Sequence, residues 1–324
     1  MHPVESGNYV IPTASLERWV NSILAWSSTN VLGAITPGRP RIGKSCAIRY
    51  FAENHRALLK GDVSVVTTEI APHRSTTEKM LYGDMLRTMG YPTTKGDPEV
   101  RRSLFVGRLV EAAGWSALRK VLVVVDEGQN LDSFTLGLLS AVHNELVRNH
   151  KVTCMWLIVG QEELRSFRQT LIAEGKRQLV ARFLRGTLEF GALRADDDFR
   201  YCVSCYDKLR FPLGHGPTYT GHYAPAAVAA GYLLESDVDL ILETLQKVAA
   251  EHGILCLDEL SMEAFVSVMN DLLMYQLPKL SVGDHLDVDM VLESAEAADW
   301  VRLEEEAFLS DVVATAADKN VAAA

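Results

Sequence analysis

The sequence has no long hydrophobic run, no secretory leader and few cysteines, and each absence excludes a class of protein. No stretch reaches the roughly eighteen uninterrupted apolar residues that a membrane-spanning helix needs. The first ten residues lack the basic start and apolar core of a secretory signal. Five cysteines, odd in number and scattered, argue against a disulfide framework. We therefore expect a cytoplasmic protein that does not bind a membrane.

Metal-binding patterns are also scarce. Cys202 and Cys205 form a lone C-x-x-C with no second pair nearby. Metal binding or redox use is one interpretation of this pair, and two incidental thiols on a helix is the one that we favour. His215 and His222 lack close acidic or thiol companions, so we predict no metal site around them.

Charge is unevenly distributed along the 324 residues. Residues 1–193 contain 24 lysines and arginines against 18 acidic residues, a net charge of +6. Residues 194–324 contain 8 against 24, a net charge of −16. The first part is therefore compatible with a polyanionic partner, and the second is not. For the acidic part we favour the simpler interpretation of a solvated surface.

Hydrophobic periodicity divides the chain into three predicted regions. Residues 1–28 form an N-terminal helical segment, and residues 29–194 alternate apolar strands with helices. Residues 195–324 read as acidic helices, except that 211–225, rich in Gly, Pro, His and Tyr, is expected to be an ordered loop. This pattern predicts an α/β core, with a parallel sheet flanked by helices, followed by an α-helical lid.

One stretch of the middle region fits a phosphate-binding pattern. Gly38-Arg-Pro-Arg-Ile-Gly43-Lys44-Ser45 matches G-x-x-x-x-G-K-[ST], after an apolar run at 31–35 and before a predicted helix. Glycines let the backbone curl around a phosphate chain, and the amides of the helix N-terminus face the anion. A Gly-rich turn that caps a helix is the alternative, which a second motif makes weaker.

The pattern assigns chemistry to its residues. Lys44 would reach the β- and γ-phosphates of ATP, and the Ser45 hydroxyl would ligate Mg²⁺. Pro40 removes a backbone donor, but it precedes the amides nearest Gly43, so we treat it as a tolerable departure. The predicted nucleotide-binding residues are Gly38, Arg39, Pro40, Arg41, Ile42, Gly43, Lys44, Ser45 and Cys46.

The second motif is an apolar run, 120–125, that ends in Asp126 and Glu127. A run that is apolar on both faces suits a central parallel strand, and the acids fall at its carboxyl end, where open α/β sheets bind ligands. Asp126 would hold Mg²⁺, mostly through water, and Glu127 would polarise the attacking water. A strand that merely ends at a polar loop is the weaker alternative, because the P-loop lies upstream.

Together these motifs resemble an AAA+ ATPase, which has an extra strand between the two motifs and a helical region after the core. The string Asp126-Glu-Gly-Gln-Asn-Leu131 resembles the DEAQNL signature of TniB/TnsC-type transposition ATPases and of ExeA-type secretion ATPases. The segments 157–164, 178–183 and 188–193, the last overlapping a strand predicted at 187–191, resemble further elements of these families. The resemblance covers about residues 15–195.

The resemblance implies further site residues. Arg182 stands where an arginine in this family tends to reach the nucleotide of a neighbouring subunit, and a guanidinium there would stabilise the transferring phosphoryl group. Arg185 is a nearby competitor, and a surface salt bridge is the alternative for either. Gln161, after the strand at 152–159, would be the "sensor 1" residue that feels the γ-phosphate, unless it is only a turn glutamine. No lid arginine of the "sensor 2" kind is evident.

Basic residues gather between positions 73 and 120, a segment that contains nine lysines and arginines and five acidic residues. They are Arg74, Lys79, Arg87, Lys95, Arg101, Arg102, Arg108, Arg119 and Lys120. Lysine and arginine without base-reading context would bind double-stranded DNA through its phosphates, independently of sequence and with strong salt dependence. A solvated helix face is the alternative.

The resemblance thus predicts an ATP- and Mg²⁺-dependent regulator of DNA transposition. It would form a homo-oligomeric ring or helical filament on duplex DNA, mark the target, and recruit a transposase with a target-selection protein. ATP hydrolysis would dismantle the assembly. One alternative is an ExeA-like ATPase of secretion or envelope assembly, although such proteins usually add a membrane span and a wall-binding domain. Another is a slowly hydrolysing signalling NTPase that serves as a scaffold.

Overall fold

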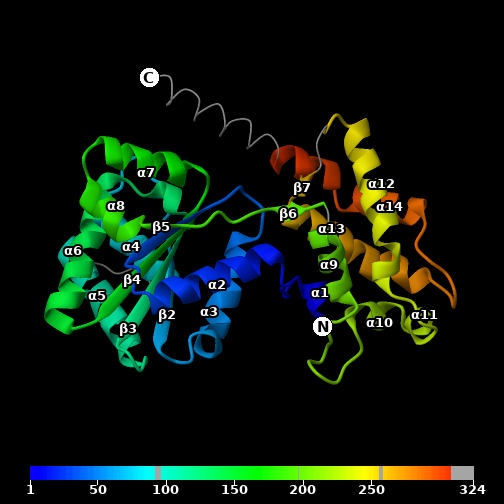
Figure 1. Ribbon diagram of the computed structural model, residues 1–324, viewed down its shortest axis with the longest axis horizontal. Helices are drawn as coiled ribbons and strands as arrows, with labels where there is room; N and C mark the ends of the chain where they lie inside the picture. The colour runs from blue at the N-terminus through cyan, green and yellow to red at the C-terminus, as the bar shows by residue number, and fades with distance from the viewer. Residues whose placement is uncertain (92–95, 196, 255–257, 308–324) are drawn as a thin grey trace. The chain divides into compact units, whose positions relative to one another are not determined.

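The computed structural model describes residues 1–91, 96–195, 197–254 and 258–307 (Figure 1). Its contacts divide the chain into two compact units. Within the described residues, the first contains Met1–Glu17, Pro40–Gly43 and the chain from Gly191 to residue 307, and the second contains Arg18–Arg39 and Lys44–Phe190. The end of the acidic helical region predicted over 195–324, from residue 308 onward, lies outside the described residues.

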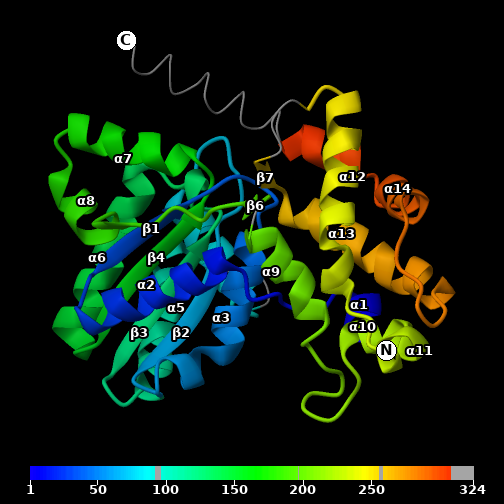
Figure 2. The same ribbon diagram turned by 45° about the vertical axis from the view of Figure 1, so that its right-hand side comes forward.

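The second unit is built on a five-stranded parallel sheet in the order β2-β3-β4-β1-β5. The strands are β1 (Gly33–Pro37), β2 (Val63–Glu69), β3 (Lys120–Asp126), β4 (Thr153–Gly160) and β5 (Gly186–Thr187). β4 lies between β1 and β3, which confirms the expected extra strand between the two motifs (Figure 2). Because all five strands are parallel, β1 and β3, which carry the two motifs, end at the same edge of the sheet.

Helices cover both faces of this sheet. They are α2 (Ala14–Ser28), α3 (Lys44–Leu58), α4 (Glu78–Thr88), α5 (Pro98–Gly114), α6 (Ser133–His150), α7 (Glu163–Ala173) and α8 (Arg177–Phe183). On one face Val121, Val123 and Val125 form a core with residues of α4 to α8. On the other, Trp19 of α2 packs edge-on against Phe51 of α3 and donates its indole N–H to a β1 threonine. The strand residues are apolar on both faces because both are covered.

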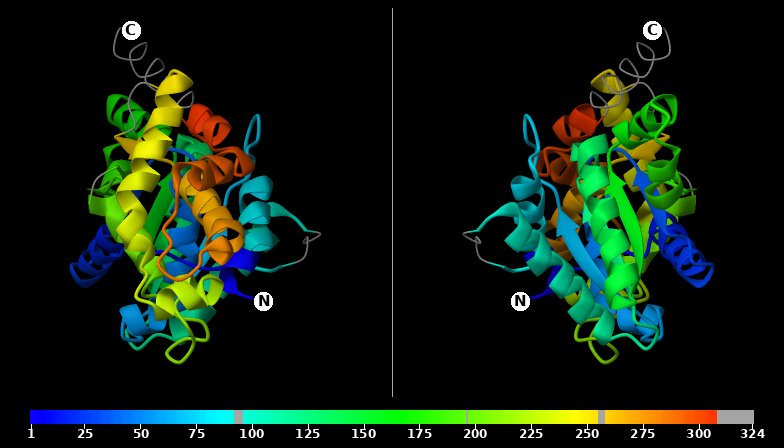
Figure 3. Two further views of the ribbon diagram at one scale, coloured as in Figure 1. Left: turned by 90° about the vertical axis from the view of Figure 1, so that its right-hand side faces the viewer. Right: turned by 90° about the vertical axis from the view of Figure 1, so that its left-hand side faces the viewer.

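The first unit is helical, as expected for the region after residue 195. Its helices are α1 (Pro3–Ser6), α9 (Asp197–Tyr206), α10 (Tyr219–Tyr223), α11 (Pro225–Ala229), α12 (Val238–Glu251), α13 (Met262–Asp271) and α14 (Val288–Ala297), followed by a helical stretch over 300–307. α14 packs against both α12 and α13 (Figure 3). One apolar core, which includes Phe199, Phe265 and Trp300, joins these helices. A two-residue strand pair, β6 (Leu193–Arg194) with β7 (Glu259–Leu260), was not predicted.

Two predictions of secondary structure were wrong in part. The expected loop at 211–225 contains α10 and the start of α11, because Thr218 caps α10 by accepting from the Gly221 amide and Pro225 suits a first helical turn. The last strand covers only 186–187 instead of 187–191. The amides of Leu188 and Phe190 nevertheless donate to β1 carbonyls, so this segment still follows the sheet.

The two cysteines of the C-x-x-C pair are buried on α9. Burial raises the pKa of the Cys202 thiol to about 12, so this thiol stays protonated at neutral pH. In the described part of the chain, no group of three or more His, Cys, Asp or Glu side chains is placed to hold a metal ion. Of the helices that the structure describes, none has the length and apolar content that crossing a bilayer demands.

Candidate nucleotide-binding site

The predicted P-loop connects the end of β1 to the start of α3. The amide of Gly38 donates to the carbonyl of Gly160 at the end of β4, 3.1 Å away, which ties the start of the loop to the sheet. Gly43, just before α3, has a φ of 97°, a conformation that L side chains rarely adopt. This explains why the pattern requires glycine at the position before Lys44.

Lys44, the first residue of α3, folds back over the loop. Its Nζ donates to the carbonyl of Gly38 at 2.6 Å and also to the carbonyl of Arg39. Burial lowers the pKa of Lys44 to about 8, and the nearby carboxylates of Asp126 and Glu127 only partly oppose that shift. A phosphate group would supply the opposite charge that stabilises the protonated amine.

The hydroxyl of Ser45 and the carboxylate of Asp126 meet at the carboxyl edge of the sheet. Ser45 Oγ donates to Asp126 Oδ2 at 3.2 Å, although 81 residues separate them in the sequence. Burial raises the pKa of Asp126, while a hydrogen bond from the Glu127 amide to Oδ1, at 2.9 Å, partly opposes this. Two adjacent oxygen donors beside a phosphate loop are what Mg²⁺ prefers, so these residues fit the predicted ion.

Glu127 is held in place by a glutamine that the sequence analysis did not single out. Gln129, in the short 3₁₀ turn η1 (Gly128–Asn130), donates from Nε2 to Glu127 Oε2 at 2.5 Å. Its Oε1 accepts from the backbone amide of Gln161 at 3.1 Å. Gln129 therefore connects the end of β3 to the end of β4. In the sequence, the place of Gln129 in the DEGQNL string at residues 126–131 was the signal that could have indicated this role.

Gln161 follows β4, between the strands that carry the two motifs, which is the position expected of a sensor. The next residue, Glu162, is half-buried, and burial raises its pKa. Arg165 pairs with Glu162 at 2.9 Å and with Glu189 at 2.5 Å. These ion pairs fix the start of α7 beside Gln161.

Arg182 lies on α8 and contacts α6 of its own chain. Its Nη1 donates to the side-chain and main-chain oxygens of Ser140. Burial, together with the positive charge of Arg182, lowers the pKa of His143 to about 4, so that His143 is neutral and accepts from the indole of Trp156 at 3.2 Å. Arg185 is exposed, and no contact of its guanidinium is found within the described chain.

The remaining predicted loop residues differ in environment. Ile42 is buried, and Arg39 and Pro40 are half-buried. Cys46, in the first turn of α3, is half-buried, and Arg49 donates to its Sγ at 3.7 Å. The tip of the loop, Pro40–Gly43, belongs to the helical first unit, whereas its two ends belong to the sheet-containing unit.

Most of the basic residues between 73 and 120 have partners. Arg87, Arg102 and Arg108 form ion pairs with Asp84, Glu145 and Glu111, respectively, and Arg101 donates to the Lys79 carbonyl. Lys120 is buried and donates to the Ser27 carbonyl, so its expected availability to DNA was wrong. Arg119, which is exposed, donates to the carbonyl of His150. Lys95 lies outside the described residues.

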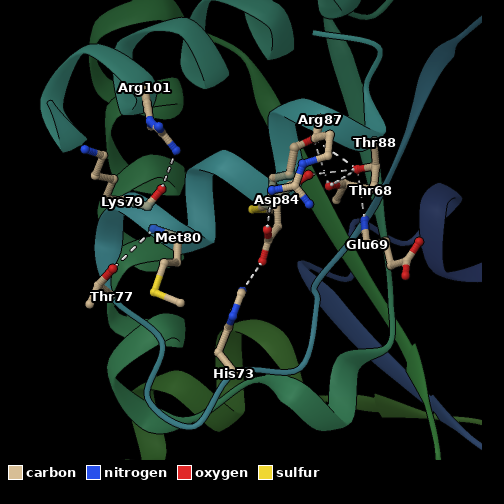
Figure 4. A network of polar contacts seen from close by, with 11 residues as sticks. Thr68, Glu69, His73, Thr77, Lys79, Met80, Asp84, Arg87, Thr88 and Arg101 are labelled. Atoms are coloured by element: carbon tan, nitrogen blue, oxygen red, sulfur yellow. Dashed lines mark hydrogen bonds and ion pairs between the residues drawn. The ribbon is translucent and has the colours of Figure 1, made fainter. Parts of the chain in front are cut away.

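Arg74 lies in the segment that joins β2 to α4, and both its side chain and that of Lys79, which lies just after this segment, are exposed. Lys79 is labelled in Figure 4. This segment is anchored by the buried Asp84, which accepts from His73 Nε2 at 2.7 Å and from Arg87 at 3.1 Å. Arg74 and Lys79 thus place two exposed cations on or beside an anchored segment. Arg87 and Arg119 are exposed as well, and each has a polar partner within the chain.

Comparison with known proteins agrees with this geometry. Residues 31–167 match the family model of an AAA domain. The core has an AAA+ P-loop NTPase fold. The Walker-type ATPase of Pyrococcus abyssi is 14% identical with a TM-score of 0.53, over 94% of this chain and 76% of that one. The Aeropyrum pernix ORC2 protein, solved in ADPNP–ADP complexes, is 15% identical with a TM-score of 0.50, over 92% and 71%.

A third structure with the AAA+ fold is domain III of the Thermotoga maritima replication initiation protein DnaA. It is 14% identical with a TM-score of 0.50, over 89% of this chain and 94% of that domain. No curated protein sequence matches the chain. At these identities the similarity of the AAA+ core to solved structures concerns the fold alone.

Proposed function

We propose that this protein binds and hydrolyses ATP with Mg²⁺. The observation that carries the proposal is the contact of Ser45 with Asp126, beside Lys44, at the edge where β1 and β3 end. Lys44 and the loop amides would bind the phosphates, and Ser45 and Asp126 would hold the ion. When bound, Mg²⁺ neutralises charge on the phosphate oxygens.

Glu127 would act as the residue that activates water. Its carboxylate lies one residue beyond Asp126 and is fixed by Gln129, which also binds the backbone at Gln161. A carboxylate held in one orientation can accept the proton of an attacking water without reorganising first. Gln161 would contact the γ-phosphate from the end of β4.

The test of this assignment is the Glu127→Gln variant. We expect Lys44→Ala to lose nucleotide binding, and Glu127→Gln to bind ATP normally but to hydrolyse it at least about a hundredfold more slowly. Phosphate release and the affinity for a fluorescent ATP analogue measure the two effects separately. Equal turnover in Glu127→Gln and wild type would remove Glu127 from the mechanism.

Arg182 would complete the nucleotide site of a neighbouring subunit, as the family resemblance implies, after exchanging its contact with Ser140. Arg185, which is exposed, is the competing candidate. Mixing Lys44→Ala subunits with Arg182→Ala subunits tests the assignment. If the arginine acts between subunits, Arg182 of a Lys44→Ala subunit can complete the intact Lys44 site of an Arg182→Ala neighbour. The mixture should then recover ATP turnover that neither variant shows alone. If only the mixture with Arg185→Ala recovers turnover, Arg185 takes the role.

We further propose that the ATP-bound protein oligomerises on duplex DNA and regulates transposition. The DEGQNL string, which resembles a signature of both TniB/TnsC-type and ExeA-type ATPases, is compatible with this, and Arg74 and Lys79 offer exposed cations for phosphates. Electron microscopy with a non-hydrolysable ATP analogue or with ADP, with and without DNA, is the test. Rings or filaments that form on DNA only with the analogue are expected. No DNA binding at low salt would favour an ExeA-like ATPase.

A slowly hydrolysing NTPase scaffold is the second candidate, and one contact favours it. Arg182 is bound to Ser140, so this proposed catalytic group would have to leave its partner before it could reach a nucleotide. Turnover that stays very low with DNA present would support the scaffold.

A further inference from the structure

The tip of the P-loop is held by the N-terminus of α13. The carbonyl oxygen of Arg41 accepts from Ser261 Oγ at 3.3 Å and from the Glu263 amide at 3.2 Å. The guanidinium of Arg41 pairs with Glu263 at 3.6 Å and with Glu306 at 2.5 Å. One loop residue thus has both its main chain and its side chain bound within the helical unit.

The partners of Arg41 are themselves fixed. Ser261 caps α13 by accepting from the Ala264 amide at 3.3 Å, and its own amide donates to the buried carboxyl of Glu304 at 3.0 Å. Glu304 and Glu306 lie on the same helical stretch at 300–307, so this stretch supports α13 and contacts Arg41 directly. The neighbour of Arg41 in the loop, Ile42, is buried at 3% exposure.

Arg41 has a backbone conformation that needs such support. Its φ is 62°, in the left-handed region that L residues other than glycine adopt at a cost. A residue keeps this strained backbone conformation when the contacts around it fix that conformation. Because Arg41 is two residues before Gly43, its conformation sets the path of the amides that lead into Lys44. A P-loop binds phosphate well only when these amides converge.

We propose that Arg41 is a positioning residue for the nucleotide site, which acts by holding the P-loop in its binding shape through Ser261, Glu263 and Glu306. This inference rests on the proposed ATP binding. Arg41 acts through the loop and does not contact the nucleotide.

The experiment is a mutant cycle with a fluorescent, non-hydrolysable ATP analogue. Arg41→Ala should weaken the affinity by about fivefold, the size expected for losing two partly exposed ion pairs. The double variant Glu263→Gln/Glu306→Gln should weaken it equally, and the triple variant should be no weaker than Arg41→Ala. Arg41→Lys, which keeps one ion pair, should recover part of the affinity. Thermal melts verify that each variant is folded.

Arg200→Ala is the matched control, because it removes an ion pair of the same kind, with Asp239, elsewhere in the same unit. It should bind like the wild type. If Arg41→Ala binds weakly but the double acid variant binds normally, Arg41 contacts the nucleotide directly and the positioning role is wrong. Normal affinity in every variant also overturns it. A wild type that fails to bind the analogue overturns the proposed function as well.

Discussion

At the scale of single residues, the two motifs assign chemistry to Lys44, Ser45, Asp126 and Glu127, and Gln129 holds the last of these by a hydrogen bond. The sequence shows Gln129 within the DEGQNL string but does not indicate its role. That role arises from a contact with Gln161 at the end of β4, 32 residues along the chain. Such contacts depend on how strands are ordered in the sheet, which no local pattern encodes.

Lys44 gives a prediction at this scale. Its pKa of about 8 means that near pH 8 about half of the free protein carries a neutral amine, which bound phosphates would charge again. Nucleotide binding should therefore take up part of a proton at pH 8 and almost none at pH 6.5, and affinity should fall as the pH rises above 8. Calorimetry in buffers of different ionisation enthalpy measures the uptake.

The control for this prediction is Lys44→Arg, in which the guanidinium stays charged at both pH values. It should show no proton uptake, whatever its affinity. Identical binding enthalpies for the wild type in all buffers at pH 8 would show that the pKa of Lys44 is not lowered in the free protein.

At the scale of elements, long apolar runs were assigned well because burial on both faces leaves a continuous signature, as in β3 and β4. Short elements were missed. The strand pair β6–β7 has two residues on each side, and α10 begins within a segment rich in turn formers. Their formation depends on partners such as Thr218 and the buried ring of Tyr219, which packs in the first unit's core.

The close contact between the backbones of β1 and α8 gives a prediction about stability at this scale. A β-carbon on Gly33 would lie 2.3 Å from the Arg182 carbonyl oxygen and 2.5 Å from the Phe183 Cα, so the two backbones touch. Gly33→Ala should reduce the free energy of unfolding by about 2 kcal/mol or more, because backbone atoms must move. Urea denaturation of the purified variant measures this loss.

The matched control is Gly137→Ala on α6. An added β-carbon there meets no atom within 4 Å, and alanine favours helix over glycine by up to about 1 kcal/mol. This variant should be as stable as the wild type or more so. Equal stability of Gly33→Ala and the wild type would mean that β1 and α8 are not in backbone contact.

At the scale of the whole molecule, the charge split between the two parts was plain in the sequence, but its meaning was not. Arg87, Arg102 and Arg108, among the cations assigned to DNA, are used in ion pairs, and Lys120 is buried. Composition counts charges without showing which ones are neutralised locally. The sequence could not predict the division of the P-loop between the two units either, because this division depends on tertiary contacts of residue 41.

The stability of the molecule should depend on pH through Glu304. Burial raises the pKa of this carboxyl to about 7 from an ordinary value of 4.5. The folded protein therefore binds a proton that the unfolded chain releases, and the resulting stabilisation is full below pH 4.5 and lost as the pH rises through 7. Between pH 5.5 and 8.5 this contribution, measured in urea titrations as the difference between the wild type and Glu304→Gln, should fall by about 2 kcal/mol.

Glu304→Gln removes the titrating group and should make this contribution independent of pH. The neighbouring Glu305 is exposed, so Glu305→Gln should keep the pH dependence of the wild type. If the difference in stability between the wild type and Glu304→Gln does not change over this range, Glu304 is ionised when folded.

Cys46 offers a practical consequence of the way α3 begins. Of the cysteines that the structure describes, Cys154, Cys202 and Cys205 are buried, and Cys46 alone is partly accessible, one residue after Ser45. A maleimide reagent added to the native protein should therefore modify the helix turn that faces the phosphates. Protection of this one thiol would turn alkylation mass spectrometry into a direct, label-based record of when the site is filled.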